Sequence, residues 1–177
     1  EAGKVDKKSL NRRRHLVLLA ANQKGLENLY TMISKSYSDD NFYRYPRMDF
    51  DLLRQYSEGV VCLTACMSGV LAGAYWQSRE DGPEAVLASM RELAAEFKDI
   101  FGDSFYGELQ WNAIPEQHEI NKFIIQICAE LDIQLVSTAD SHYPRRDAWK
   151  DRELYKRLGW LGKSAPAWDD GMPDSVE

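Results

Sequence analysis

The 177-residue sequence lacks the features that mark membrane and secreted proteins. No stretch approaches the roughly 18 consecutive apolar residues of a transmembrane helix, and the first residues, Glu1-Ala2-Gly3-Lys4, do not resemble a signal peptide. The three cysteines are an odd number, and each lies in or beside an apolar segment, which favours reduced thiols over a disulfide framework. We therefore expect a cytoplasmic protein that has no membrane partner.

Several common catalytic motifs are also missing. The sequence has no P-loop, no Gly-x-Gly-x-x-Gly, no Cys-x-x-Cys knuckle and no serine in a nucleophile elbow. A net charge of −6 argues against a domain that grips nucleic acid unaided. The charge is uneven, however, because residues 1–14 carry six Lys/Arg against two acids and residues 145–163 carry seven against three. These basic segments can either meet phosphates locally or form ordinary solvated surface.

Short apolar runs alternate with segments of helical periodicity. The expected strands are residues 15–20 (taken as buried), 60–64, 105–110 and 134–138, and the expected helices begin near residues 26, 49, 68, 83, 115 and 148. Strands that alternate with helices predict an α/β fold with a parallel sheet, either open or closed into a barrel. In such folds the chemistry gathers at the carboxyl ends of the strands.

The tripeptide Asp140-Ser141-His142 follows the last expected strand. Asp140 and His142 are two residues apart, so in an extended chain both side chains leave on the same face. A carboxylate beside an imidazole suits a divalent metal such as zinc or manganese. The two groups suit an acid–base pair equally well, and a capping Asp beside a hydrogen-bonded loop His is the third interpretation.

Two further segments carry candidate side chains. Cys66 lies where the second strand gives way to a helix, and its thiolate could ligate zinc or act as a nucleophile, or the thiol could be buried and inert. His15 begins the first strand and could equally be an ordinary core or surface histidine. Glu108 and Gln110 alternate with Leu109 and so share one face, which points either to an active centre or to a simple polar face.

Five segments, taken in order, resemble one family. They are His15-Leu16-Val17-Leu18-Leu19-Ala20 with Gly25 and Asn28-Leu29, then Tyr45-Pro46-Arg47-Met48-Asp49, Leu63-Thr64-Ala65-Cys66-Met67-Ser68-Gly69, Phe101-Gly102-Asp103 with Phe105-Tyr106 and Glu108-Leu109-Gln110, and Thr138-Ala139-Asp140-Ser141-His142-Tyr143. Over residues 13–147 the sequence resembles the PHP (polymerase and histidinol phosphatase) domain. The resemblance is to the branch found at the N-terminus of bacterial replicative DNA polymerase III alpha subunits.

The resemblance implies a partial distorted (βα)7 TIM-like barrel of the PHP type. Residues 1–12 would be a polar basic segment, residues 13–163 the later part of the PHP domain, and residues 164–177 a flexible tail or linker. It further implies that His15, Cys66, Asp140 and His142 are metal ligands, with zinc or manganese as the metal and magnesium as a third candidate. The family's opening His-x-His, and the Asp, His and Glu that follow it, have no counterpart here, so the expected site is incomplete.

The implied function is that of a PHP-domain fragment of a DNA-directed DNA polymerase in DNA replication. The parent domain would be a metal-dependent 3′–5′ exonuclease or phosphoesterase with no catalytic residues beyond the metal ligands, and its partners would be DNA and the remaining polymerase domains. Arg145, Arg146 and Arg47 would contact the DNA backbone, although Tyr45 replaces the family's usual Lys. The alternatives are a non-catalytic scaffold that stabilises the polymerase or docks a proofreading exonuclease subunit, and a stand-alone PHP phosphoesterase. We expect this chain alone to be inactive and marginally stable.

Overall fold

The computed structural model describes residues 13–38, 41–42 and 45–159. The chain divides into two compact units, one that ends at Thr138 and one that starts at Ala139. The predicted basic segment 1–12 and the predicted tail 164–177 lie outside the described residues.

The strands and helices follow the predicted order. In the first unit they are β1 (Val17–Ala20), α1 (Gln23–Ser36), α2 (Phe50–Tyr56), β2 (Val60–Leu63), α3 (Val70–Ser78), the short 3₁₀ helix η2 (Arg79–Asp81), α4 (Pro83–Phe101), the short 3₁₀ helix η3 (Gly102–Ser104), β3 (Phe105–Gln110), α5 (Pro115–Glu130) and β4 (Gln134–Thr138). In the second unit they are the 3₁₀ helix η4 (Arg146–Ala148) and α6 (Trp149–Gly159).

The helices begin where the sequence supplies partners for their first backbone N–H groups. The side chains of Asn22 and Asp49 cap α1 and α2, and each accepts a 2.9 Å hydrogen bond from the backbone N–H three residues further on. Pro83 and Pro115 stand in the first turns of α4 and α5, where a missing N–H costs nothing. The two prolines explain why the starts of α4 and α5 are predictable, whereas α1 begins at Gln23, after the Asn22 cap, and not near residue 26 as predicted.

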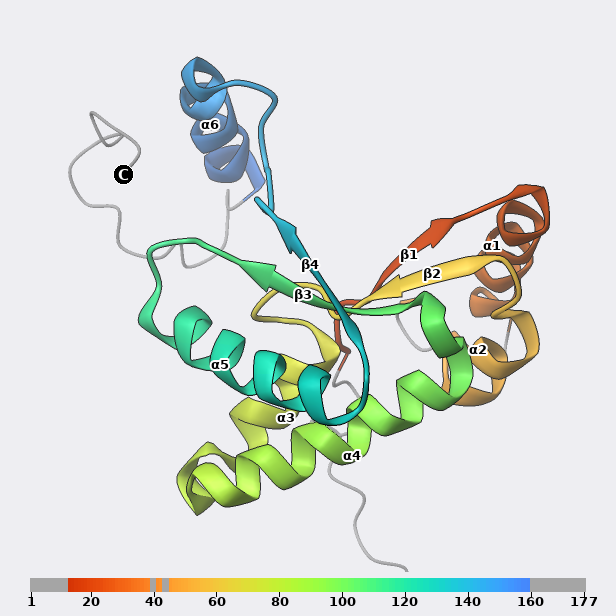
Figure 1. Ribbon diagram of the computed structural model, residues 1–177. Helices are drawn as coiled ribbons and strands as arrows, with labels where there is room; N and C mark the ends of the chain where they lie inside the picture. Colours follow the sequence, from red (N-terminus) through yellow and green to blue (C-terminus); the bar gives the residue numbers. More distant parts are fainter. Residues whose placement is uncertain (1–12, 39–40, 43–44, 160–177) are drawn as a thin grey trace, which may run out of the picture. The chain divides into compact units, whose positions relative to one another are not determined.

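The four strands form one sheet in the order β1-β2-β3-β4, but not all of them are parallel (Figure 1). Strands β2, β3 and β4 run parallel, whereas β1 runs antiparallel to β2, with Val17 opposite Leu63. The prediction of a parallel sheet is therefore wrong for β1. Helices α1 and α2 return the chain to the end of β1, where Ala21 N–H donates to the Gly59 carbonyl at 2.9 Å, so β2 starts beside the point at which β1 stopped.

Strands β1 and β4 are the two edges of this open sheet. Leu19 of β1 is 51% exposed and Leu135 of β4 is 44% exposed. The first strand is therefore not buried as predicted, because a strand that pairs on one side only leaves part of its surface uncovered. The described strands do not close into a barrel, so the (βα)7 barrel stays a prediction.

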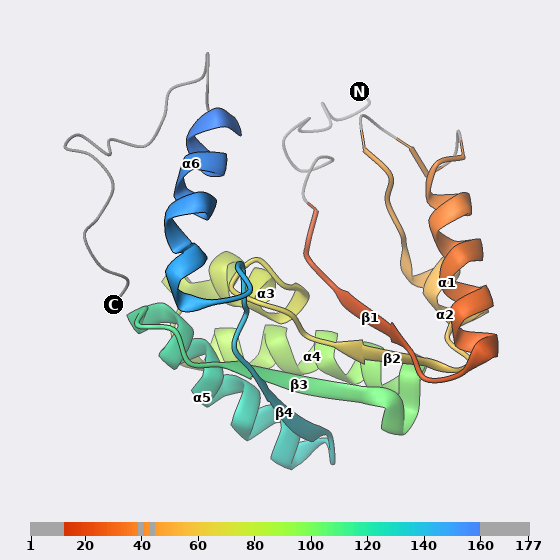
Figure 2. The same cartoon turned by 90° about the horizontal axis from the view of Figure 1, so that it is seen from above.

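Helices α3, α4 and α5 lie together on one face of the sheet (Figures 1 and 2). Helix α4 buries the predicted stripe that includes Met90, Ala94 and Phe97. The Phe97 ring packs 5.5 Å from the Phe105 ring of β3 and 5.3 Å from the Phe50 ring of α2, measured between centroids. Phe97 and Phe105 are buried, and each such side chain contributes about 1.5–3 kcal/mol on burial, so this contact holds β3 and α4 together. Phe50 is 37% exposed and adds a partly buried contact from α2.

The second unit is built around α6. Trp149 and Glu153 are buried, and the Glu153 carboxylate accepts hydrogen bonds from Lys156 Nζ at 3.0 and 3.1 Å and from Arg152 at 3.2 Å. None of the helices in the described residues is both long enough and apolar enough to cross a bilayer.

Candidate metal centre

His15 and Cys66, 51 residues apart in sequence, are neighbours in the first unit. The backbone of His15 forms a parallel bridge with Gly69, and its N–H donates to the Ser68 carbonyl at 2.9 Å. This pairing places His15 Nδ1 3.5 Å from Cys66 Sγ. The structure therefore brings together two of the four predicted ligands.

Cys66 stands in a tight turn formed by residues 64–69, here named the Cys66 turn, which joins β2 to α3. Ala65 adopts a left-handed backbone with φ of 61°, a conformation that costs a non-glycine residue roughly 1–2 kcal/mol. The turn closes where Gly69 N–H donates to the Cys66 carbonyl at 2.7 Å, and Ser68 N–H donates to Cys66 Sγ at 3.4 Å. A strained backbone at the end of a strand is a common property of functional sites.

The three thiols differ in their surroundings. Cys62 and Cys128 are buried, and burial raises the pKa of the Cys62 thiol and raises that of Cys128 to about 11. Cys66 is only partly buried and has an imidazole beside it. Of the three cysteines, Cys66 is therefore the one whose position suits a ligand or a nucleophile.

Asp140 and His142 form a separate, local pair in the second unit. Asp140 has a left-handed backbone with φ of 47°, and its carbonyl lies 2.6 Å from His142 Nδ1. A carbonyl only accepts, so Nδ1 donates to it, and in this tautomer of the neutral ring Nε2 is the nitrogen with a lone pair for a metal. The Asp140 carboxylate is 4.0 Å from the same nitrogen, with the Asp140 side chain 32% and the His142 side chain 52% exposed.

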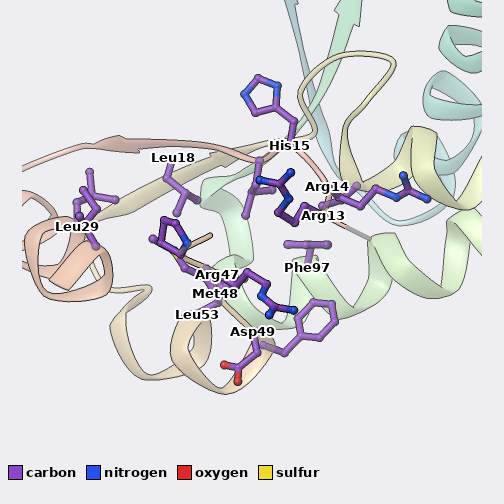
Figure 3. Close-up of a pocket in the computed structure, with 15 residues that line it drawn as sticks. Arg13, Arg14, His15, Leu18, Leu29, Arg47, Met48, Asp49, Leu53 and Phe97 are labelled. Atoms are coloured by element: carbon purple, nitrogen blue, oxygen red, sulfur yellow. The ribbon is translucent and has the colours of Figure 1, made fainter. Parts of the chain in front are cut away.

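A cavity of about 750 Å³ adjoins residues 13–16 of the first unit (Figure 3). Its wall combines apolar side chains with three arginines, Arg13, Arg14 and Arg47. The guanidinium of Arg13 lies 3.7 Å from the centroid of the Tyr45 ring, a cation–π contact, so Tyr45 orients a neighbouring cation. In Figure 3 the His15 ring points away from Phe97, which also lines the cavity. Arg47 therefore lines the same cavity as Arg13 and Arg14.

The other two predicted basic residues belong to the second unit. The Arg145 guanidinium is exposed and pairs with Asp147 at 3.4 Å, and Arg146 begins η4. An exposed ion pair of this kind is weak and easily exchanged for another anion.

The side chains of the first pair, His15 and Cys66, meet only part of what a divalent metal needs. An imidazole nitrogen next to a sulfur is a zinc-like pair, but zinc takes four ligands. Within the described part of the chain, no group of three or more His, Cys, Asp or Glu side chains could hold a metal ion. His15 and Cys66 are therefore of a chemical type that suits zinc, but two side chains do not complete a zinc site.

Sequence patterns give neither Arg13 nor Glu108 a definite role. Arg13 was not singled out because it lies at the end of a basic segment, and only the ring of Tyr45 beneath it distinguishes it from its neighbours. The alternation of Glu108 and Gln110 correctly predicted a shared face, since Gln110 Nε2 donates to Glu108 Oε1 at 3.2 Å. Nothing in that pattern indicated the contacts that Glu108 makes with other strands.

Known proteins resemble this chain over most of its length. The PHP domain family matches residues 2–112. The chain is 43% identical over 129 residues to the DNA polymerase III subunit alpha of Aquifex aeolicus, a match that covers 73% of this chain and 10% of that protein. It is 38% identical over 155 residues to the subunit of the same name from Borreliella burgdorferi (85% of this chain, 12% of that protein) and 33% identical over 162 residues to that from Campylobacter jejuni (90% and 13%). The chain thus spans about a tenth of the length of these relatives.

Proposed function

Because the chain belongs to the PHP domain family and is similar to DNA polymerase III alpha subunits, we propose that it is the later part of the PHP domain of a replicative polymerase. In that setting the open sheet would contribute to a (βα)7 barrel, and the protein would act on DNA in the cytoplasm. The approach of His15 Nδ1 to Cys66 Sγ, at 3.5 Å, is the observation that carries the proposal. Two donors from distant segments converge at strand ends, which is where α/β folds place their chemistry.

The reaction we propose is hydrolysis of the phosphodiester at the 3′ end of a DNA strand. His15 and Cys66 would be metal ligands in the first unit, and Asp140 and His142 would be metal ligands in the second unit. A bound divalent metal supplies Lewis-acid stabilisation of the charge that develops on phosphate and makes water a better nucleophile. Nε2 of His142 is suited to bind a metal because the other ring nitrogen, Nδ1, donates its proton to the Asp140 carbonyl and so fixes the ring.

The arginines would position the DNA backbone. Arg47 gathers with Arg13 and Arg14 around one cavity of a chain whose net charge is −6, so this group offers phosphate a local cationic surface. Arg145 and Arg146, three and four residues after His142, would provide a second such contact. Guanidinium groups suit this task because they bind phosphate oxygens in pairs.

A non-catalytic scaffold is the second candidate function. The observation that favours it is that, among the described residues, no three metal-binding side chains lie close enough together to hold a metal ion. A PHP domain that holds no metal could still stabilise the polymerase or dock a proofreading exonuclease subunit. Metal binding separates the two candidates.

The test is metal content and affinity in the 177-residue chain. Wild-type protein, His15→Ala and Cys66→Ala would be dialysed against zinc, manganese and magnesium, and bound metal would be measured by mass spectrometry. Loss of one ligand should lower affinity about 100-fold or more, because a structural zinc site is worth roughly 10–16 kcal/mol spread over four ligands. Metal-loaded wild type would then be assayed on 3′-labelled single-stranded DNA.

His118→Ala is the matched control, because His118 is exposed on α5 and outside the site. It should keep wild-type metal content. Equal metal content in the wild type, His15→Ala and Cys66→Ala would overturn the ligand assignment. A wild-type chain that binds no metal would favour the scaffold, whereas a lack of DNA hydrolysis alone would not, because we expect this chain by itself to be inactive.

A further inference from the structure

Glu108 is a buried carboxylate at the centre of the sheet. It belongs to β3, between β2 and β4, and is 4% exposed. The neighbouring Gly107 faces α5, since a Cβ there would meet Cys128 and Ile124 of that helix. Because successive strand residues point to opposite faces, Glu108 projects away from α5.

The Glu108 side chain connects the carboxyl ends of all three parallel strands. Its Oε2 accepts the Ala65 N–H, just past β2, at 3.0 Å. Its Oε1 accepts the Thr138 hydroxyl of β4 at 2.5 Å and the Gln110 amide at 3.2 Å. The contact with β2 is reciprocal, because the backbone N–H of Glu108 donates to Thr64 Oγ1 at 2.8 Å.

Among the described residues, no cation pairs with this carboxylate. The ion pairs of the described residues do not include Glu108. Burying a charged or polar group in this way is costly unless every lone pair finds a donor. An apolar residue would fill the same space more cheaply, so what Glu108 uniquely provides is a set of directed acceptors.

The most informative of its three donors is Ala65, which begins the strained part of the Cys66 turn. Its left-handed conformation persists only where surrounding contacts hold it. The bond to Glu108 is such a contact, and the next residue in the chain presents its thiol to His15 at 3.5 Å. A change of a few tens of degrees at Ala65 would swing Cys66 Sγ away from the imidazole.

We infer that Glu108 is a positioning residue, which through the Ala65 N–H holds Cys66 opposite His15. The inference rests on the proposed function in that the pair it positions is the proposed metal-binding pair. Thr138 shares the carboxylate, so the same side chain also fixes the end of β4. What matters is the reach of the acceptor across to β2 and not the negative charge itself.

Two conservative variants separate reach from charge. Glu108→Asp keeps the charge but withdraws the carboxylate by one methylene from Ala65. Glu108→Gln keeps the length, and one amide oxygen can still accept from Ala65. Gln110 Oε1 is buried and has no hydrogen-bond partner within the described structure. The Gln110 side chain can therefore turn so that this oxygen accepts from the new amide. Glu108→Gln should therefore behave like wild type.

The first readout needs no metal. In wild-type chain, cross-relaxation between the Cys66 β-protons and the His15 ring protons should be observed by NMR. It should persist in Glu108→Gln and be lost in Glu108→Asp. The second readout is the affinity for cobalt, which is measured from the thiolate-to-cobalt charge-transfer band. This affinity should fall about 10–100-fold in Glu108→Asp and stay unchanged in Glu108→Gln.

Glu119→Asp is the control for shortening a hydrogen-bonded carboxylate elsewhere, since Glu119 accepts the Tyr75 hydroxyl at 2.5 Å. It should change neither readout. Wild-type behaviour of Glu108→Asp, or equal losses in Glu108→Asp and Glu108→Gln, would overturn the inference. A wild-type chain that binds no cobalt would count against the proposed function only, because the cross-relaxation still decides the role of Glu108.

Discussion

The two candidate ligand pairs are built in opposite ways. His15 and Cys66 are far apart in sequence, and their approach depends on a backbone bridge, a strained turn and a carboxylate from a neighbouring strand. Asp140 and His142 are two residues apart, and a single hydrogen bond from the imidazole to the local backbone sets their geometry. The first pair is therefore a product of the tertiary fold, whereas the second depends on only a few residues of chain.

Because the two pairs are built differently, substitutions in them should affect the stability of the fold to different extents. Changes around the first pair disturb contacts on which the packing of β2, β3 and α3 depends. Changes in the second pair remove side chains that are about one third and one half exposed. Variants in the two regions should therefore differ in the free energy of unfolding even where their effects on metal affinity are similar.

The largest effect is expected for Gly69→Ala. A Cβ at this position would lie 2.2 Å from the Thr64 carbonyl oxygen and 2.7 Å from that of Cys66, and backbone atoms cannot move aside cheaply. We expect a loss of about 3 kcal/mol in the free energy of unfolding, measured by urea titration.

Gly73→Ala is its matched control, since the nearest atoms to the new Cβ would be the far end of the flexible Arg14 side chain, with Nε at 2.1 Å and Cδ at 2.5 Å, which can move aside more cheaply than backbone. It should stay within about 1 kcal/mol of wild type, because alanine also gains in helix propensity. Equal losses of unfolding free energy in Gly69→Ala and Gly73→Ala would contradict the interpretation that the Cys66 turn tolerates substitution least.

An intermediate effect is expected for Thr138→Val. This near-isosteric change removes the 2.5 Å hydrogen bond to the buried Glu108 carboxylate, and hydrogen bonds to charged groups contribute about 1.5–3 kcal/mol. A loss of about 2 kcal/mol should appear in the same urea titration, with the contact between His15 and Cys66 retained.

Ser137→Ala, one residue earlier, removes only an exposed hydrogen bond from Trp111 Nε1 and should cost less than about 1 kcal/mol. A Thr138→Val variant as stable as Ser137→Ala would show that the strand-end network adds little to stability.

The smallest effect on stability is expected for Asp140→Ala and His142→Ala. Both side chains lie at a local and partly exposed site, so the free energy of unfolding should change by less than about 0.5 kcal/mol. Bound zinc or manganese should nevertheless fall in both variants if they are ligands. Unchanged metal content in both would remove Asp140 and His142 from the site, and a large loss of stability would contradict the contrast between the two pairs.

The order of strands and helices was predictable because it depends on local signals. Asn22, Asp49, Pro83 and Pro115 mark helix starts, and the apolar stripe of α4 has helical spacing. Strand direction is not local. The run from Val17 to Ala20 looks the same whether it pairs parallel or antiparallel, and the reversal of β1 depends on where α1 and α2 return the chain.

The candidate site was predictable only in part for the same reason. Spacing alone could not connect His15 with Cys66, and it was the ordered resemblance to the PHP family that singled them out together. The shared face of Glu108 and Gln110 followed from strand alternation. The partners of Glu108, Ala65 and Thr138, come from two other strands, and no pattern within β3 specifies which strands lie beside it.

The open edges of the sheet have a consequence for handling the chain. β1 and β4 each present one side without a partner strand among the described residues, and Leu19 and Leu135 are exposed beside those edges. Unpaired N–H and C=O groups flanked by leucine form a template on which a second copy can add strand to strand. We therefore expect self-association of this chain to increase with concentration, so its folding and metal affinity should be measured in dilute samples.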